Sequence, residues 1–221
     1  MPIADLTNMP TTSAAYPPEY FDKQDNSADE YFYSFARLTV HIDEAAIGAL
    51  TALYGGLLTD NMAILDLMSS WRSHLPQDKQ FAEVIGHGMN SAEMRDNPQL
   101  TDHFVQNLNV EQSMPLNPNY FDAVLCAVSI QYLQKPLEVF AEVYRLLKPG
   151  GVFIVSFSNR CFPTKAVGAW LHSGDQDHIS LVHSYFQLSA PWEDAHARIK
   201  SAETPPNTDP LYMLWAYKPK A

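Results

Sequence analysis

From residue 62 onward, short apolar runs alternate with segments of helical periodicity. Five runs are typical of strands buried on both faces: MAILDLM (62–68), FAEVIGHG (81–88), DHFVQNLN (102–109), FDAVLCAVS (121–129) and GVFIVSFS (151–158). Near-continuous apolar strands that alternate with helices are typical of a parallel sheet covered on both faces. The pattern therefore predicts an α/β fold.

The clearest helix is expected in the segment PLEVFAEVYRLLKPGG, residues 136–151. Pro136 suits the first turn of a helix, and Pro149-Gly150-Gly151 would stop it before the fifth strand. One face of this helix is apolar, because apolar residues recur there at helical spacing: Leu137, Phe140, Val143, Tyr144 and Leu147.

The flanks of this region carry weaker signals. Asp43 is expected to cap a helix that Gly55 and Gly56 would end. Another helix is expected over 178–190, and two strands, around 194–202 and 211–218, close the chain. We therefore expect two parts: an N-terminal lead-in and helical cover over residues 1–60, and the α/β domain over residues 61–221.

Composition narrows the class of partner. The 221 residues include 14 basic and 25 acidic ones, a formal charge of −11, and no basic cluster. This balance argues against nucleic acid, whose binding depends on Lys and Arg at phosphates. No apolar run approaches the roughly 20 residues of a membrane span, no secretory signal is recognisable, and Cys126 and Cys161 form no paired motif. We expect a cytoplasmic protein with no membrane or nucleic-acid partner.

The block FDAVLCAVSIQYLQKPLEVFAEVYRLLKPGGVFIVSFSN, residues 121–159, resembles class I S-adenosylmethionine-dependent methyltransferases, especially their type 11 branch. Its FDAV, its RLLKPGG and the apolar strand that follows stand in the order typical of that family. ILDL (64–67) resembles the family's first strand, and VIGHGMNSAEM (84–94) its second strand with the start of the next helix. The resemblance covers roughly residues 60–160.

The resemblance implies a three-layer, Rossmann-like sheet that is mostly parallel with its last strand antiparallel. It also implies S-adenosylmethionine as cofactor, lying across the carboxyl ends of the first strands. In the family, the first strand ends in an acidic residue and a glycine-rich turn. Asp66 matches the acidic residue, but the three glycine positions fall at Met68, Ser70 and Arg72.

The altered turn leaves two interpretations open. Ser69 and Ser70 have hydroxyls that can hydrogen-bond a carboxylate such as the methionyl end of the cofactor, and Arg72 can pair with it. Alternatively, Ser69 or Ser70 caps a short helix that runs up to Pro76. Met68 is the more serious departure, because glycine allows a left-handed backbone and close approach to a ligand.

The second strand lacks the acidic residue that would hold the ribose, since the expected position falls at Gly88, after His87. Met89 and Asn90 come next, and Asn90 either replaces one hydrogen bond to the ribose or forms a capping box with Glu93. After the third strand, Asn107 and Leu108 match the adenine position, where Asn107 is alternatively a turn residue.

The end of the fourth strand is expected to border the reaction centre. Val128 and Ser129 would line it, and Tyr132 fits either this border or the core. On the acceptor side, the segment YFYSFARLTVHID (31–43) offers Tyr31, Tyr33, Arg37 and His41. These residues either line a substrate pocket, with Arg37 alternatively on the cofactor carboxylate, or form an apolar lid.

No nucleophile-plus-base arrangement identifies catalytic residues. The segment HSGDQDH (172–178) matches no strong metal motif, so we expect a solvated loop and no metal. The sequence leaves two functions open: a methyltransferase acting on a small molecule, and a methyltransferase-like binding or scaffold protein that does not catalyse. A nicotinamide-dependent oxidoreductase is disfavoured because no GxGxxG follows the first strand.

Overall fold

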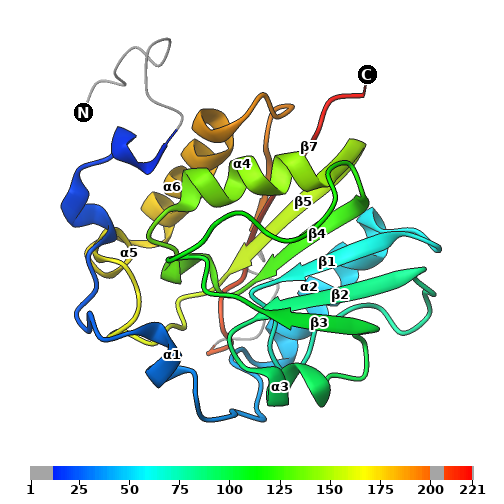
Figure 1. Cartoon of the computed structure of the whole chain (residues 1–221), viewed down its shortest axis with the longest axis horizontal. Coiled ribbons are helices and arrows are strands. Elements are labelled where there is room, and N and C mark those ends of the chain that lie inside the picture. Colours follow the sequence, from blue (N-terminus) through cyan, green and yellow to red (C-terminus); the bar gives the residue numbers. More distant parts are fainter. Residues whose placement is uncertain (1–11, 200–206, 221) are drawn as a thin grey trace.

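The computed structural model describes residues 12–199 and 207–220. Its centre is a seven-stranded sheet in the order β3-β2-β1-β4-β5-β7-β6 (Figure 1). The strands from β3 to β5 are parallel, and β7 is antiparallel to both β5 and β6. The predicted α/β fold with an antiparallel last strand is thus confirmed. The strands are β1 (Ala63–Leu67), β2 (Glu83–Gly88), β3 (Asp102–Val105), β4 (Phe121–Ala127), β5 (Leu147–Phe157), β6 (His196–Ile199) and β7 (Tyr212–Tyr217).

Helices cover both faces of this sheet (Figure 1). On one face, Phe140 of α4 (Pro136–Leu146) packs against Phe153 of β5 and Phe186 of α6 (Asp175–Ser189), with ring centroids 4.8 and 4.9 Å away. On the other face, α2 (Glu44–Leu57) shares a core with strand residues such as Ile64 and Ile154. The short helices are α1 (Asp29–Phe32), α3 (Ser91–Arg95), α5 (Gly168–Leu171) and the 3₁₀ turns Ser13–Ala15, Pro18–Phe21 and Ile130–Tyr132.

The connection from β1 to β2 contains no helix, so the short helix expected up to Pro76 is wrong. His74 adopts a left-handed backbone with φ 57°, which interrupts any regular turn, and Pro76 disfavours a helical residue before it. The hydroxyl of Thr51 in α2 donates to the His74 carbonyl over 2.9 Å. The helix that precedes β1 therefore supports this irregular crossover.

Two further expectations need correction. Asp43 caps α2 as predicted, accepting from the Ala46 N–H over 2.8 Å, but the helix runs through Gly55 and Gly56 to Leu57. The segment 172–178 is not a solvated loop, because α6 begins at Asp175 and the buried His178 ring stacks on Trp170 at 3.8 Å. Within the described residues, no group of His, Cys, Asp or Glu could hold a metal ion.

A buried ion network fastens the N-terminal segment to the domain. The Lys23 ammonium lies 2.9 Å from Asp29, and the fully buried Lys165 lies 3.4 Å from Asp29 and 3.0 Å from Asp25. Because an unpaired buried charge is costly, this arrangement holds residues 23–29 firmly against the loop that follows β5.

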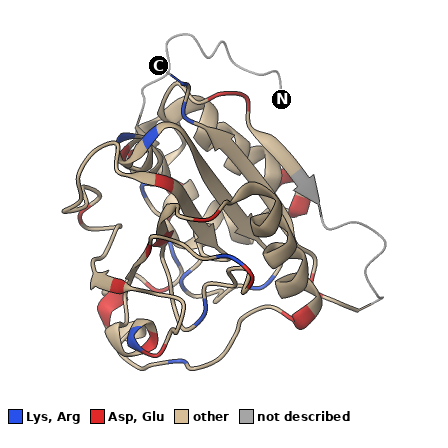
Figure 2. Ribbon diagram, turned by 90° about the vertical axis from the view of Figure 1, so that its right-hand side faces the viewer, with Lys and Arg blue, Asp and Glu red and all other residues tan. Residues whose placement is uncertain are grey.

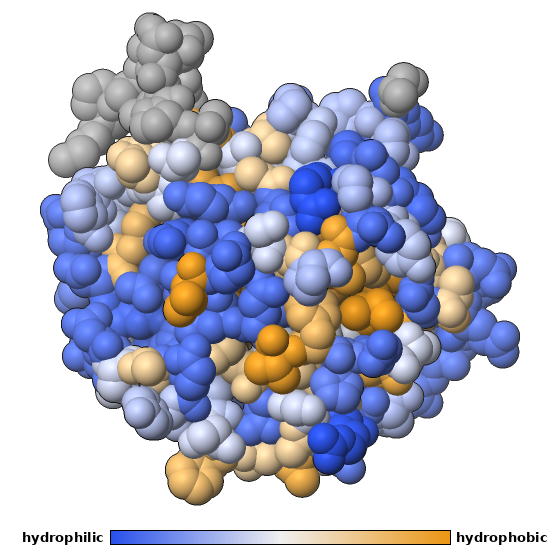
Figure 3. Space-filling view, in the orientation of Figure 1, coloured by the Kyte–Doolittle hydropathy of each residue, from blue (hydrophilic) through white to orange (hydrophobic). Residues whose placement is uncertain are grey.

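The surface that the described residues form shows no large basic region (Figure 2), as expected from the excess of acidic over basic residues. Figure 2 shows the few basic residues interspersed with acidic ones, and Figure 3 shows a largely hydrophilic face with separate apolar spots. In the parts of the chain that the structure describes, no helix is long and apolar enough to cross a membrane.

Candidate active site

A cavity of about 290 Å³ lies at the carboxyl ends of β1, β2 and β4, beneath the segment 33–42. Every residue predicted to bind the cofactor lines this cavity: Asp66, Met68, Ser69, Ser70, Gly88, Met89, Asn90, Asn107, Leu108, Val128 and Ser129. Of the residues expected on the acceptor side, Tyr33, Arg37 and His41 also line it. Tyr31 does not, because its side chain points to solvent from α1 and is 76% exposed.

Asp66, the penultimate residue of β1, has a buried carboxyl group. Ser69 and Ser73 both donate to its Oδ2 over 2.6 Å. Burial raises the pKa of Asp66 to about 6, and the two serine hydroxyls oppose that rise. The turn after β1 therefore folds its serines back onto Asp66, so the Ser69 hydroxyl is already engaged within the protein.

Left-handed backbone conformations gather around this cavity. Among the described residues other than glycine, positive φ occurs at turn asparagines (Asn61, Asn119 and Asn207) and at Met68, His74 and Val128, with φ of 56°, 57° and 51°. The last three all line the cavity. Met68 thus keeps the conformation that glycine provides in the family, and Val128 is strained because its side chain is β-branched.

The missing ribose carboxylate has a steric explanation at Gly88. A Cβ at this position would lie 2.4 Å from the Ser69 carbonyl oxygen, so no side chain fits while the turn sits there. The Ser69 N–H donates to the His87 carbonyl over 2.6 Å, which holds the turn against β2. An acidic residue at 88 is therefore incompatible with this loop.

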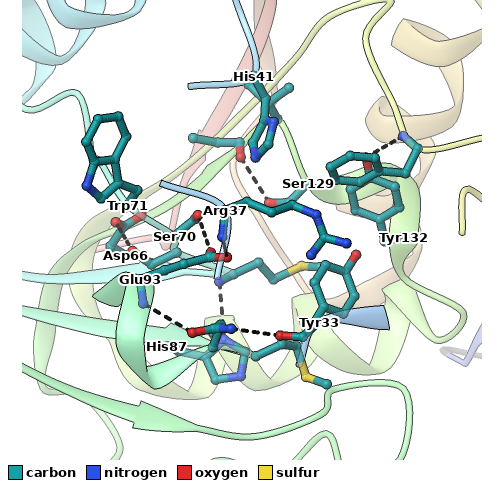
Figure 4. A pocket seen from close by; sticks show the side chains of 18 of the residues that line it. Tyr33, Arg37, His41, Asp66, Ser70, Trp71, His87, Glu93, Ser129 and Tyr132 are labelled. Carbon is teal, nitrogen blue, oxygen red and sulfur yellow. Dashed lines mark hydrogen bonds between the residues drawn. The ribbon is translucent and has the colours of Figure 1, made fainter. Parts of the chain in front are cut away.

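Glu93 brings a carboxylate to the cavity that the sequence pattern does not point to. It is buried, accepts from the Ser70 hydroxyl through Oε2 and from the Arg37 N–H through Oε1, both over 2.6 Å, and reaches into the cavity (Figure 4). The Asn90-x-x-Glu93 spacing is typical of a capping box and does not by itself indicate a place in the cavity. Asn90 does cap α3, accepting from Ala92 and Glu93 over 2.9 and 3.2 Å, but no bond from Glu93 back to Asn90 is among the described contacts.

The asparagines at the cavity also hold protein groups. The Asn90 amide donates to the Tyr33 carbonyl over 2.8 Å. The side-chain amide of Asn107 donates to Glu30 over 2.8 Å. The side-chain oxygen of Asn107 accepts from the Asn109 N–H over 3.0 Å, as in an Asx turn. Each side-chain carbonyl oxygen has two lone pairs, so the Asn107 oxygen can accept one further hydrogen bond.

At the end of β4, Ser129 donates to the Ala127 carbonyl over 3.0 Å. The buried Tyr132 accepts from the Phe162 N–H over 2.9 Å, and burial raises its pKa to about 12. This contact holds the loop after β5 over the cavity, where Cys161 and Phe162 join the lining.

The segment 33–42 supplies the opposite wall. The Arg37 guanidinium lies over the Phe32 ring at 4.5 Å and near the Phe162 ring at 5.4 Å. His41 packs edge-on against Phe162 with ring centroids 5.3 Å apart, and burial lowers its pKa. Burial also disfavours the charged form of Tyr33 and therefore raises the pKa of its phenol. This wall is therefore aromatic, with one cation set into it.

Comparisons with known proteins agree with this architecture. A family model described as a methyltransferase domain matches residues 74–155. A ubiquinone biosynthesis O-methyltransferase of Xanthomonas oryzae pv. oryzae is 31% identical over 193 aligned residues, covering 75% of this chain and 73% of that protein. A malonyl-[acyl-carrier protein] O-methyltransferase of Marinomonas sp. is 30% identical over 79 residues, but the match spans 28% of that protein and 36% of this chain.

Solved structures share the fold at low identity. Phosphoethanolamine N-methyltransferase 2 of Haemonchus contortus, in complex with S-adenosyl-L-methionine, has a TM-score of 0.57 at 13% identity, over 93% of this chain and 60% of that one. A SAM-dependent methyltransferase of Methanosarcina mazei has a TM-score of 0.51 at 17% identity, over 76% of this chain and 98% of that one. Together with the sheet order and the aligned relatives, these findings show that the chain belongs to the class I S-adenosylmethionine-dependent methyltransferases, in their type 11 branch.

Proposed function

We infer that this protein transfers a methyl group from S-adenosylmethionine to a small molecule. One observation carries the proposal: the cavity at the carboxyl ends of the parallel strands keeps buried acceptors, Asp66 and Glu93, although its loop lacks glycine. Ligands of open α/β sheets bind at this edge. The volume of the cavity, about 290 Å³, supports a small molecule and not a folded macromolecule as the methyl acceptor.

The residues present fit the cofactor. Glu93 offers the carboxylate that Gly88 cannot provide, and a carboxylate with one hydrogen bond at each oxygen can accept further ones from ribose hydroxyls. Met68 supplies the left-handed turn without a glycine. Asn107 and Leu108, which we assign to the adenine, and Val128 and Ser129, which we assign to the methyl end, all line the cavity.

The cofactor, when bound, supplies an activated methyl group, so the chain mainly positions the two reactants. The segment 33–42 and the loop at Phe162 line the cavity opposite the strand ends, where they would shield the reactants from water. Where the acceptor must lose a proton, His41 at the cavity wall is the candidate to take it, since burial lowers its pKa and so favours the unprotonated imidazole, although as a weaker base.

A test of this proposal is calorimetric titration with S-adenosylhomocysteine. We expect micromolar binding by the unmodified protein, weakened about tenfold or more in Glu93→Ala because the ribose loses its acceptor. Glu44→Gln, an exposed acid in the first turn of α2, is the matched control and should bind normally. No binding at millimolar ligand would exclude the catalytic proposal.

A second function, a methyltransferase-like binding protein that does not catalyse, is favoured by one specific observation. The Ser69 hydroxyl is held by Asp66 and both polar ends of Asn90 are bonded within the protein, so these groups are satisfied without a ligand. Failure of the titration would favour this second function.

A further inference from the structure

Three arginines line the cavity, and two of them are engaged by acids. Arg72 stacks over Trp71 at 3.7 Å and lies 3.9 Å from Asp96. Arg160 pairs with Asp209 over 2.8 Å. Within the residues that the structure describes, the Arg37 guanidinium has no carboxylate in ion-pair range.

The carboxylates of the same cavity are engaged elsewhere. Asp29 pairs with Lys23 over 2.9 Å, and Asp66 accepts from Ser69 and Ser73 over 2.6 Å. Glu93 accepts from Ser70 and from the backbone, not the side chain, of Arg37. A guanidinium at a cavity wall with no carboxylate beside it favours an anionic ligand there, because its charge is not yet neutralised by a neighbour.

Hydrogen bonds and a ring contact within the protein hold the Arg37 guanidinium in place. Its two terminal nitrogens donate to the Phe32 and Phe35 carbonyls over 2.9 and 3.3 Å, and its central carbon lies 4.5 Å from the centroid of the Phe32 ring. A guanidinium has five N–H donors, so donors remain for a ligand. This fixed orientation suits a planar or tetrahedral anion, because Arg binds both in bidentate geometry.

The position of Arg37 separates it from the cofactor end. The guanidinium lies beside Tyr33 and Tyr132, whereas Asp66 and Ser70 are on the other side of the cavity (Figure 4). Tyr132 and Phe162 stack with ring centroids 6.0 Å apart and border the same region. The surroundings of Arg37 are thus the aromatic acceptor wall.

We propose that Arg37 binds an anionic group, a carboxylate or a phosphate, carried by the methyl acceptor. This inference rests on the proposed function, because it assigns the acceptor's chemistry within the same cavity. The competing role, that Arg37 holds the methionyl carboxylate of the cofactor, makes the opposite prediction for cofactor affinity.

The experiment measures cofactor and anion binding separately. S-adenosylhomocysteine is titrated into the unmodified protein, Arg37→Gln and Arg37→Lys. Benzoate, phenyl phosphate and the neutral benzamide are then titrated with S-adenosylhomocysteine at saturation. Arg95→Gln is the matched control, because Arg95 is an exposed arginine of α3 outside the cavity lining.

We expect Arg37→Gln to keep S-adenosylhomocysteine affinity within about twofold. Unmodified protein should bind benzoate or phenyl phosphate about tenfold more tightly than benzamide, and the tighter of the two identifies the anion. Arg37→Gln should lose this preference, Arg37→Lys should keep part of it because it keeps the charge, and Arg95→Gln should keep all of it.

Two results would overturn the inference. One is a tenfold or greater loss of S-adenosylhomocysteine affinity in Arg37→Gln with anion binding unchanged, which would assign Arg37 to the cofactor. The other is no anion preference, or no probe binding, in unmodified protein that binds S-adenosylhomocysteine. Failure of the unmodified protein to bind S-adenosylhomocysteine would instead count against the proposed function.

Discussion

The backbone N–H of Met68 donates to Nδ1 of His87 over 3.2 Å, and the other ring nitrogen of His87 lies 3.0 Å from the Gln106 carbonyl oxygen. An acceptor at Nδ1 and a donor at Nε2 define one neutral tautomer. The His87 ring therefore joins the turn after β1 to the ends of β2 and β3, which together form the cavity floor.

This geometry predicts that His87 stays neutral far below the usual range. Burial lowers its pKa to about 4. Because the pKa of His87 is lower in the folded protein than in the unfolded chain, the stability that neutral His87 contributes is present above about pH 6.5. It is lost as pH falls toward 4. The free energy of unfolding should fall by about 3 kcal/mol relative to His87→Gln over that window. Ring ¹⁵N shifts that show protonation near pH 6.5 would contradict this.

Asp66 predicts a pH dependence of opposite sign. Burial raises its pKa to about 6, so the protonated form is favoured in the folded protein. Its contribution is present below about pH 4 and is lost as pH rises through 6. Relative to Asp66→Asn, the unmodified protein should lose on the order of 3 kcal/mol of unfolding free energy between these values. A constant difference across the window, measured by urea unfolding, would show that the carboxyl is not perturbed.

Met68 permits a direct test of backbone strain. Met68→Ala and Met68→Gly both remove the side chain, but only glycine relaxes at φ 56°. The free energy of unfolding of Met68→Gly should therefore be about 1 kcal/mol higher than that of Met68→Ala. This is expected although glycine usually destabilises a protein by giving the unfolded chain more conformational freedom. The reverse order in urea unfolding would mean that the turn changes conformation in the variants.

The buried ion network predicts a large effect at Asp29. Asp29→Asn leaves Lys23 without its carboxylate and Lys165 with Asp25 alone, so we expect a loss of about 3–5 kcal/mol in unfolding free energy. Asp25→Asn is the control and should cost clearly less, because the Asp25 side chain is 37% exposed. Equal losses in calorimetric unfolding would show that the network is not shared through Asp29.

Much of the fold follows from the sequence pattern because the sheet is buried on both faces. Runs such as FDAVLCAVS and GVFIVSFS are nearly continuous in apolar residues. β4 forms within the first run, and β5 includes the second but begins earlier, at Leu147. The crossover 68–82 was not predicted, since its path depends on contacts with α2 and on left-handed residues that local patterns do not reveal.

The site could be predicted in position but less well in chemistry. Strand ends such as Asp66, Gly88 and Val128 meet at one sheet edge in any fold of this topology, so they line one cavity. Glu93 was missed because its local spacing indicated a helix cap, whereas its partners, Ser70 and Arg37, are distant in sequence. Tyr31 and Tyr33 are both tyrosines, so the sequence does not show which of them lines the cavity. In the structure Tyr31 lies within α1, whereas Tyr33 follows its last residue and lines the cavity.

The placement of β7 between β5 and β6 has a consequence for synthesis on the ribosome. β6 is made before β7 but pairs only with it in the described sheet, so β6 emerges with no strand to join. Until β7 follows, β5 also presents an open edge of unpaired amides. Nascent chains halted between these strands should therefore be the ones that recruit chaperones, although β1 to β5 have all been synthesised by then.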